Sequence, residues 1–132
     1  MKSVLLVDDD NTILLSIGVR LKHMGYTVYT AKDAVTAVSA VVKNEPDVVV
    51  LDVSLPAGDG FLVAGRLQKL VTSGATPIIF ITGNENPVLR QRATLMGAAA
   101  FLTKPFDATS LADAVESALS PGDNWMPRAS GL

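Results

Sequence analysis

The sequence contains no cysteine and only one histidine among its 132 residues. Without cysteine, the chain has no disulfide, no zinc–thiolate site and no thiol nucleophile. Long apolar runs are also missing, since Val48–Leu51 and Ile78–Ile81 are far shorter than the ~18 residues of a membrane-spanning helix. Val4–Val7 is too short for the core of a signal peptide. These absences predict a cytoplasmic protein without a membrane span.

A strong charge of either sign is missing as well. Eleven basic and thirteen acidic residues give a net charge of −2, which argues against nucleic-acid binding through bulk charge. The chain is 48% hydrophobic and 18% charged, so it has enough apolar surface to build a core and is not globally disordered. Its length corresponds to one domain at the usual ~100–200 residues per domain.

Short apolar or β-branched runs alternate along the chain with helical patterns, and they are expected to form strands. The runs are Val4–Val7, Thr27–Thr30, Val48–Leu51, Ile78–Ile81 and Ala99–Leu102. The clearest of them are continuous rather than alternating between apolar and polar residues. This pattern is typical of strands that are buried on both faces in a parallel sheet.

Helix signals lie between these runs. Asp33 and Asp107 are predicted N-caps, Pro87 suits a first helical position, and Gly25 and Gly97 are stop signals. Pro46 is expected to stop the second helix, and Gly74 to mark the end of the third. The apolar faces are expected at Ile13, Leu14, Ile17 and Leu21; at Val35, Val38 and Val42; at Phe61, Leu62, Leu67, Leu70 and Val71; and at Leu111, Val115 and Leu119. Five successive β–α units predict an α/β fold, a doubly wound five-stranded parallel sheet with helices on both faces.

Residues 1–120 contain all of these patterns and are predicted to form the domain. Residues 121–132 contain the only tryptophan, Trp125, but no periodicity. They are expected to be a C-terminal tail or linker remnant. Met1 favours a natural start of the chain.

Polar side chains follow four of the five predicted strands. They are Asp8, Asp9 and Asp10 after the first strand, Asp52 after the third, Thr82 after the fourth and Lys104 after the fifth. In an open parallel sheet, ligands bind beyond the carboxyl ends of the strands. These residues are therefore expected to converge on one edge of the sheet.

Converging carboxylates repel one another unless a cation lies between them. The simplest such cation is Mg²⁺ (or Mn²⁺), which prefers oxygen ligands and also takes phosphate oxygens. Lys104 and Thr82 offer a positive charge and a hydroxyl to a phosphoryl group. The sequence therefore predicts a site that binds a cation and accepts a phosphoryl group.

In order and spacing, four segments resemble the motifs of the response-regulator receiver domains of two-component signalling, the class of the chemotaxis regulator. The segments are Leu5–Asp10, Val50–Gly60, Ile81–Gly83 and Gly97–Phe106. The resemblance extends over residues 2–119, nearly the whole chain. It implies a flavodoxin-like sheet with the strand order 2-1-3-4-5.

The resemblance also implies a role for each residue of the site. Asp52 matches the phospho-acceptor. Asp9 matches the acid that binds the metal directly, and Asp8 the acid that acts through a metal-bound water. The backbone carbonyl of Ser54 matches the third protein ligand of the metal, and Lys104 matches the lysine that binds phosphate. Asp10 lies outside this acidic pair and is expected to be a helix cap.

The family's conformational switch matches two further residues, Thr82 as the switch hydroxyl and Phe101 as the switch aromatic. Ser54 and Asn84 flank the site at variable positions that influence the lifetime of the aspartyl phosphate. The Lys104–Pro105 peptide bond is expected to be cis. The chain departs from many relatives at Gly83, where they carry alanine, and this glycine is expected to loosen the loop after Thr82.

The function implied is that of a response regulator in a two-component system or phosphorelay. A sensor histidine kinase or a histidine phosphotransfer protein would phosphorylate Asp52 in a Mg²⁺-dependent reaction. The surface of the fourth helix, fifth strand and fifth helix would then change shape and signal to a downstream protein that the sequence does not identify. Such a domain assists its own phosphorylation and dephosphorylation but is not an enzyme. Direct binding to nucleic acid or to a membrane is not expected. A homodimer that forms on phosphorylation is left as an alternative.

Two alternatives remain beside this interpretation. A Mg²⁺-dependent aspartyl phosphohydrolase would also place an aspartate after a buried strand, but it typically carries Asp-x-Asp, whereas Ser54 occupies the second position here. A degenerate receiver that only binds proteins would lack some of the key residues, and here all of them are present. A flavin-binding or dinucleotide-binding domain would need a glycine-rich or hydroxyl-rich phosphate loop, and Asp8–Asn11 stands in its place.

Overall fold

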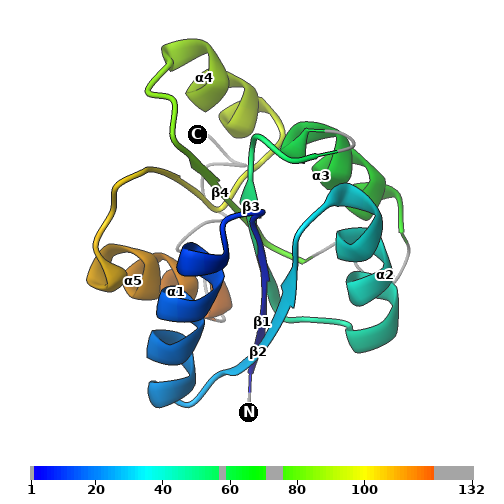
Figure 1. The fold of residues 1–132 in the computed structure, drawn as a ribbon. Helices are drawn as coiled ribbons and strands as arrows, with labels where there is room; N and C mark the ends of the chain where they lie inside the picture. The colour runs from blue at the N-terminus through cyan, green and yellow to red at the C-terminus, as the bar shows by residue number, and fades with distance from the viewer. Residues whose placement is uncertain (1, 57–58, 71–75, 121–132) are drawn as a thin grey trace.

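The computed structural model describes residues 2–56, 59–70 and 76–120, and in these ranges strands and helices alternate as predicted (Figure 1). The strands are β1 (Ser3–Val7), β2 (Thr27–Ala31), β3 (Val48–Asp52), β4 (Ile78–Thr82) and β5 (Ala100–Thr103). The helices are α1 (Asn11–His23), α2 (Ala34–Asn44), α3 (Gly60–Lys69), α4 (Pro87–Leu95) and α5 (Ala108–Leu119). None of these helices is long and apolar enough to cross a membrane. The predicted tail, residues 121–132, lies outside the described residues.

The five strands form one parallel sheet in the order β2-β1-β3-β4-β5, which confirms the predicted fold class. Val7 of β1 pairs with Leu51 of β3, and Asp52 pairs with Ile81 of β4. Because all strands run in the same direction, their carboxyl ends meet at one edge of the sheet. Asp52 is itself the last residue of β3, one position beyond the predicted end of that strand.

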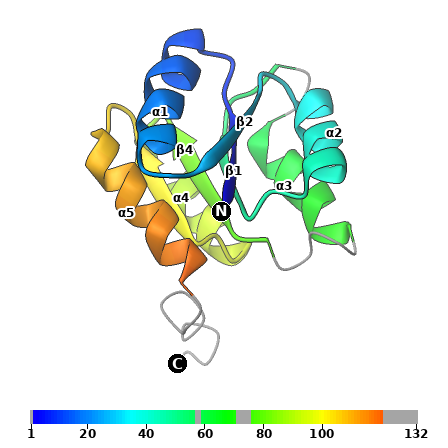
Figure 2. The ribbon, with the colours of Figure 1, turned by 90° about the horizontal axis from the view of Figure 1, so that it is seen from below.

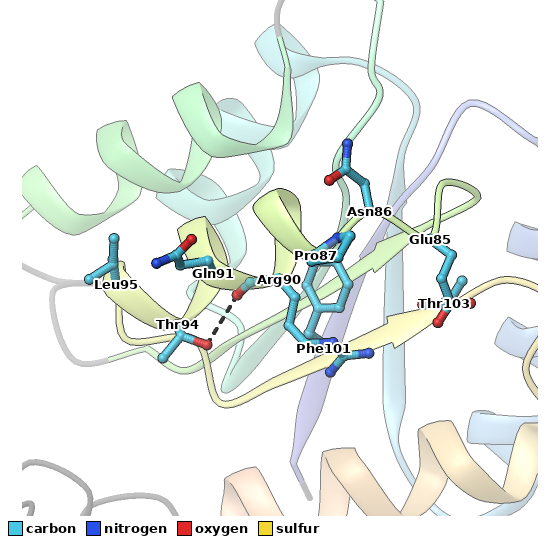
Figure 3. Close-up of a pocket in the computed structure, with 9 residues that line it drawn as sticks. All are labelled: Glu85, Asn86, Pro87, Arg90, Gln91, Thr94, Leu95, Phe101 and Thr103. Carbon is cyan, nitrogen blue, oxygen red and sulfur yellow. Dashed lines mark hydrogen bonds between the residues drawn. The ribbon is translucent and has the colours of Figure 1, made fainter.

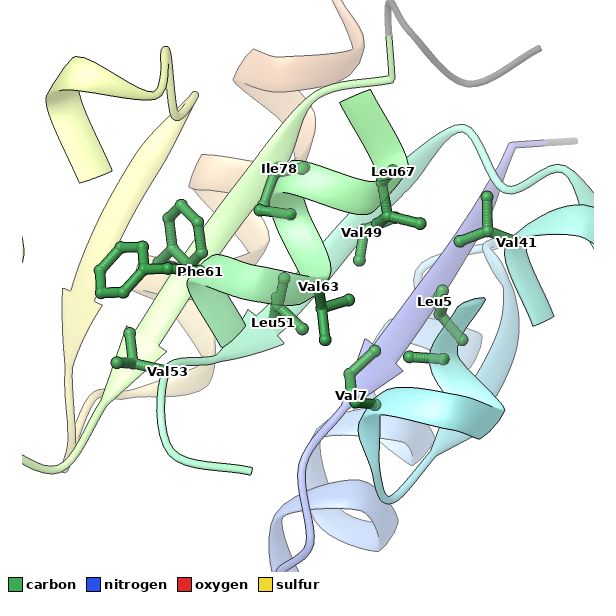
Figure 4. Close-up of a cluster of buried hydrophobic side chains, with 14 of the residues drawn as sticks. Leu5, Val7, Val41, Val49, Leu51, Val53, Phe61, Val63, Leu67 and Ile78 are labelled. Carbon is green, nitrogen blue, oxygen red and sulfur yellow. The ribbon is translucent and has the colours of Figure 1, made fainter. Parts of the chain in front are cut away.

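Helices cover both faces of the sheet, with α1 and α5 on one face and α2, α3 and α4 on the other (Figures 1 and 2). Along each central strand the side chains alternate between the two cores. Leu5 and Val7 of β1 pack toward α2 and α3 (Figure 4), whereas Val4 and Leu6 pack toward α1 and α5. This burial on two sides explains why the strands read as continuous apolar runs.

The helix starts follow the predicted capping chemistry. Each of the five helices in the described ranges begins after an Asp or Asn whose side chain accepts a hydrogen bond from a backbone N–H of the first turn. The capping residues are Asp10, Asp33, Asp59, Asn86 and Asp107. Asp10 therefore caps α1, as expected, and its Oδ1 lies 2.8 Å from the backbone nitrogen of Thr12.

The predicted buried face of α2 is wrong at two of its three valines, and only Val38 of the three packs against the core, where it is partly buried. Val35 and Val42 are 66% and 58% exposed, and the face turned to the sheet carries Ala34, Ala37 and Val41. The apolar residues cover a wide arc of this helix, with Thr36, Ser39 and Lys43 on the remaining side, so valine spacing alone could not identify the buried face. Close packing on the sheet selects the alanines. In α3, Leu62 is likewise exposed, whereas Leu67 is buried as predicted.

The end of α3 also differs from the prediction. The helix ends at Lys69, with Leu70 as the C-cap residue in extended conformation rather than as a helical core position. The predicted continuation through Val71 to Gly74 lies outside the described residues. Helix α2 ends at Asn44, two residues before Pro46, as expected. Its C-cap residue Glu45 takes the left-handed conformation with φ 47°.

Candidate functional site

Three carboxylates gather at the carboxyl edge of the sheet. Asp8 and Asp9 follow β1, and Asp52 ends the neighbouring strand β3. Each offers one oxygen that lies within 4.8 Å of the oxygens from the other two. Asp8 and Asp52 are buried, and Asp9 is exposed to solvent. Adjacent strands of a parallel sheet thus bring together acids that are more than forty positions apart in the sequence.

Lys104 connects two of these acids. Its Nζ lies 2.8 Å from Oδ2 of Asp8 and 3.3 Å from Oδ2 of Asp52. The backbone of Lys104 is also held at the end of β4, because its N–H donates a hydrogen bond of 2.6 Å to the Thr82 carbonyl. The Lys104–Pro105 peptide bond is cis. The ammonium group therefore enters the acidic site from the loop that follows β5.

The surroundings of Asp52 disfavour its charged form. Burial raises the pKa of this carboxyl to about 6, and the negative charge of Asp8 acts in the same direction. A hydrogen bond from the Ser54 N–H to Oδ1, at 3.0 Å, and the Lys104 ammonium partly offset this rise. Burial also disfavours the charged form of Lys104, but the close contact with Asp8 and the negative charges of Asp52 and Asp8 raise the pKa of the ammonium overall.

The oxygen donors of the site fit a hard divalent cation. Asp8 accepts a hydrogen bond from the Asp10 N–H at Oδ1, at 2.9 Å, but its buried Oδ2 has only the ion pair with Lys104 and no well-directed hydrogen bond. Three carboxylates facing one ammonium leave excess negative charge in a partly buried space. Carboxylate oxygens are the ligands that Mg²⁺ prefers, so the residues present suit this ion.

Thr82 completes the edge of the sheet. It is the last residue of β4, and its side chain is buried with Oγ1 accepting a 3.0 Å hydrogen bond from the Asn84 N–H. Ser54 and Asn84 are both exposed, each two residues beyond the end of its strand. The structure therefore brings Asp8, Asp9, Asp52 and Lys104 into one cluster, with Thr82 at the end of the next strand.

Phe101 lies on β5, where it is paired in register with Phe80 of β4. Its ring is partly buried and lines a surface pocket of about 680 Å³ between α4 and β5 (Figure 3). The guanidinium of Arg90 lies over this ring, 4.8 Å from the centroid. The candidate switch aromatic thus borders the pocket between α4 and β5, and it also packs against the buried core on that face of the sheet.

Gly60 is a site residue to which the sequence interpretation gave no role. Its N–H donates a 2.7 Å hydrogen bond to the Val53 carbonyl. A Cβ atom at this position would overlap the backbone carbonyl oxygen of Asp52 and would lie 3.0 Å from Cα of Val53. The available signal was the glycine directly after the Asp59 cap, within the same motif as Asp52. Arg90 was also missed, and nothing in its sequence context marks it.

Comparisons with known proteins agree with this geometry. The family model described as response regulator receiver domain matches residues 4–116. The chain is similar to the chemotaxis response regulator CheY4 of Vibrio cholerae, with 31% identity, a TM-score of 0.84, and coverage of 90% of this chain and 99% of that one. It is also similar to the non-phosphorylated HemR receiver domain of Leptospira biflexa, with 32% identity, a TM-score of 0.84, and coverage of 92% and 97%.

Proposed function

This chain belongs to the response regulator receiver domain family of two-component signalling, and we propose that Asp52 accepts a phosphoryl group from a histidine kinase or a histidine phosphotransfer protein. The observation that carries the proposal is the buried Asp52 carboxylate, which lies beside a second buried acid and within 3.3 Å of the Lys104 ammonium. A receiver domain is a signalling domain, and the reaction leaves the domain itself phosphorylated.

The cation site follows from the carboxylate cluster. Asp9, Asp52 and the Ser54 backbone carbonyl would hold Mg²⁺ directly, and Asp8 would hold it through a water molecule. When bound, the ion supplies positive charge that neutralises the carboxylates and the incoming phosphoryl oxygens. The raised pKa of Asp52 supports this arrangement, because a carboxylate that is costly to ionise in isolation gains most from a neighbouring cation.

The transfer itself is a displacement at phosphorus. An Asp52 carboxylate oxygen forms the new O–P bond while the N–P bond of the donor phosphohistidine breaks, and the electron pair of that bond goes to the imidazole nitrogen. Lys104 turns from Oδ2 of Asp52 to a phosphoryl oxygen. Thr82 Oγ1 leaves the Asn84 N–H and donates to another oxygen. Positioning and charge neutralisation supply the catalysis, as is general for phosphoryl transfer.

The switch uses the same two elements. As Thr82 turns toward the phosphoryl group, it leaves space on the inner side of β5, and the Phe101 ring moves into this space. The surface formed by α4, β5 and α5 then changes shape and is recognised by a downstream protein. Phosphorylation drives the change because the phosphoryl group makes contacts only in the switched state.

Intact-mass measurement tests this function. The protein is incubated with a small phosphoramidate donor, with and without Mg²⁺, beside the Asp52→Asn variant. We expect a Mg²⁺-dependent gain of one phosphoryl group in the wild type and no gain in the variant. No gain with any donor would contradict phosphoryl acceptance and favour a domain that only binds proteins. Continuous release of phosphate from varied phosphate esters would favour a hydrolase instead.

A further inference from the structure

Helix α4 is weakly attached to the rest of the domain. Ala93 is its only buried residue, whereas Val88 and Leu95 are 59% and 80% exposed. Most helices of globular proteins are stabilised by burying an apolar face, and α4 buries little of one. Other contacts must therefore contribute more than usual to holding this helix in place.

Two arginines of α4 provide such contacts, and each stacks on a phenylalanine from a different element. The guanidinium of Arg90 lies 4.8 Å from the ring centroid of Phe101 on β5. The guanidinium of Arg92 lies 4.2 Å from the centroid of Phe61 on α3. A cation over an aromatic ring at such distances contributes about 0.5–1 kcal/mol at an exposed site. The helix is thus fastened on both sides by the same kind of interaction.

The two phenylalanines differ in their freedom to move. Phe61 is 3% exposed and packs against Phe80, with ring centroids 4.8 Å apart, so its ring is fixed in the core. Phe101 is only partly buried and borders the pocket beside α4 (Figure 3). The Arg92 contact is therefore a static attachment, whereas the Arg90 contact depends on where the Phe101 ring lies.

The Arg90 contact lies at the pocket between α4 and β5, the edge strand of the sheet. Arg90 is exposed and lines this pocket together with Phe101, and Figure 3 shows the arginine side chain beside the ring. A Phe101 ring that turns inward, toward the space beside Thr82, moves away from the guanidinium. The stacking then stabilises only the outward state of the ring. An interaction made in one state alone shifts the equilibrium toward that state.

We infer that Arg90 is a positioning residue that holds the Phe101 ring outward and so favours the unphosphorylated state of the domain. The inference rests on the proposed function, since it assigns Arg90 a role in the switch of that function. Removal of the guanidinium should raise the population of the state that binds the phosphoryl group. The loss of one such contact corresponds to a shift of about 2- to 5-fold in this equilibrium.

The test measures the affinity for beryllofluoride, a mimic of the phosphoryl group, by calorimetry at saturating Mg²⁺. Arg90→Met keeps the apolar part of the side chain and removes the charge, so we expect its dissociation constant to fall about 2- to 5-fold. Arg92→Met is the matched control, from the same helix and with the same type of contact. Because Phe61 is fixed, this control should keep the wild-type dissociation constant.

A second comparison uses the Phe101→Leu background, where no ring remains for the guanidinium. There, Arg90→Met should cause no further change. An unchanged or weaker affinity in Arg90→Met, an equal gain in Arg92→Met, or a gain that persists in Phe101→Leu would each overturn the role of Arg90. A wild-type protein that binds no beryllofluoride would instead contradict the proposed function itself, so the two failures are distinguishable.

Discussion

At the scale of single residues, the site is governed by the cost of burying like charges together. Asp8 and Asp52 are 1% and 4% exposed, and one ammonium lies between them. Burial is the main reason that the pKa of Asp52 is raised, the charge of Asp8 adds to the rise, and the single ammonium of Lys104 offsets it only in part. The same excess of negative charge favours the binding of a divalent cation. A bound cation would in turn favour the approach of an anionic phosphoryl group.

This imbalance predicts a pH-dependent effect of Asp52→Asn on stability. The pKa of Asp52 is about 6 in the folded protein against 3.8 ordinarily, so the folded state binds this proton more tightly than the unfolded chain. Wild-type stability should therefore fall as pH rises from about 4 to 6, by on the order of 2–3 kcal/mol, while the uncharged asparagine avoids this loss.

Urea denaturation without metal at several pH values measures the difference. Asp52→Asn should be the more stable protein at pH ~8, and the gap should close toward pH ~4. A gap of the same size at every pH would show that the carboxyl of Asp52 is not desolvated in the folded state.

Single residues also show how far the sequence could predict this site. Asp8, Asp52, Thr82 and Lys104 could be located because each ends or follows a recognisable strand, and parallel strands must bring their ends to one edge. The Arg90 stacking could not be predicted, since it depends on how α4 is rotated against β5, and nothing in the local sequence determines this rotation.

At the scale of elements, the turn from β3 into α3 keeps the site compact. Gly60 begins α3 directly against the backbone of Asp52, and a side chain there would meet the carbonyl of Asp52. Such a clash lies between two backbone segments, so it cannot be relieved by rotating a side chain. The start of α3 must then move away from the strand that carries the phospho-acceptor.

Gly60→Ala is therefore expected to lower the free energy of unfolding by about 1–3 kcal/mol, as overpacking generally does. Gly65→Ala is the matched control in the same helix, because its added Cβ would meet no atom within 4 Å beyond its chain neighbours and the adjacent helix backbone. The control should gain about 0.5–1 kcal/mol from helix propensity. Chemical denaturation of both variants checks this, and equal effects would contradict the close approach at Gly60.

Helix α2 shows where a sequence pattern fails at the element scale. Its valines at helical spacing indicated one face, but the sheet contacts the face with Ala34, Ala37 and Val41. A helix whose apolar residues cover such a wide arc offers two possible buried faces, and the shape of the opposing sheet decides between them. Small alanines allow the helix to approach the strands closely, and this close approach cannot be predicted from residue spacing and hydrophobicity.

Two neighbouring valines of α2 test this orientation. Val41→Ala should lower the free energy of unfolding by about 2 kcal/mol, because Val41 is 1% exposed and its methyl groups fill the core. Val42→Ala should change it by less than about 0.5 kcal/mol, because Val42 is 58% exposed. Denaturation curves that rank the two variants the other way would support the face predicted from the valine spacing.

At the scale of the whole molecule, the net charge of −2 equals the summed formal charge of the site residues. Leaving out Asp8, Asp9, Asp52 and Lys104 leaves ten acidic and ten basic residues in the sequence. One divalent cation would therefore neutralise both the site and the formal charge of the chain. Cation binding should act on the stability of the whole domain, because the ligands come from different strands and exist as a site only in the folded state.

Mg²⁺ is accordingly expected to stabilise the protein against unfolding. At about 100 times the dissociation constant, the gain should be ~2.7 kcal/mol. Asp9→Asn should lose most of this gain. Asp10→Asn should retain it, because Asp10 caps α1 and asparagine caps a helix equally well. Thermal unfolding with and without Mg²⁺ measures both, and a full gain in Asp9→Asn would place the ion elsewhere.

The central claim, that Asp52 is the phospho-acceptor, is tested most directly by locating the modified residue. Borohydride cleaves an aspartyl phosphate reductively and leaves homoserine, which peptide sequencing by mass spectrometry places at one position. After incubation with phosphoramidate and Mg²⁺, we predict homoserine at residue 52 and unmodified Asp8 and Asp9. Homoserine at Asp8 or Asp9, or none at all in protein that has gained a phosphoryl group, would contradict the account.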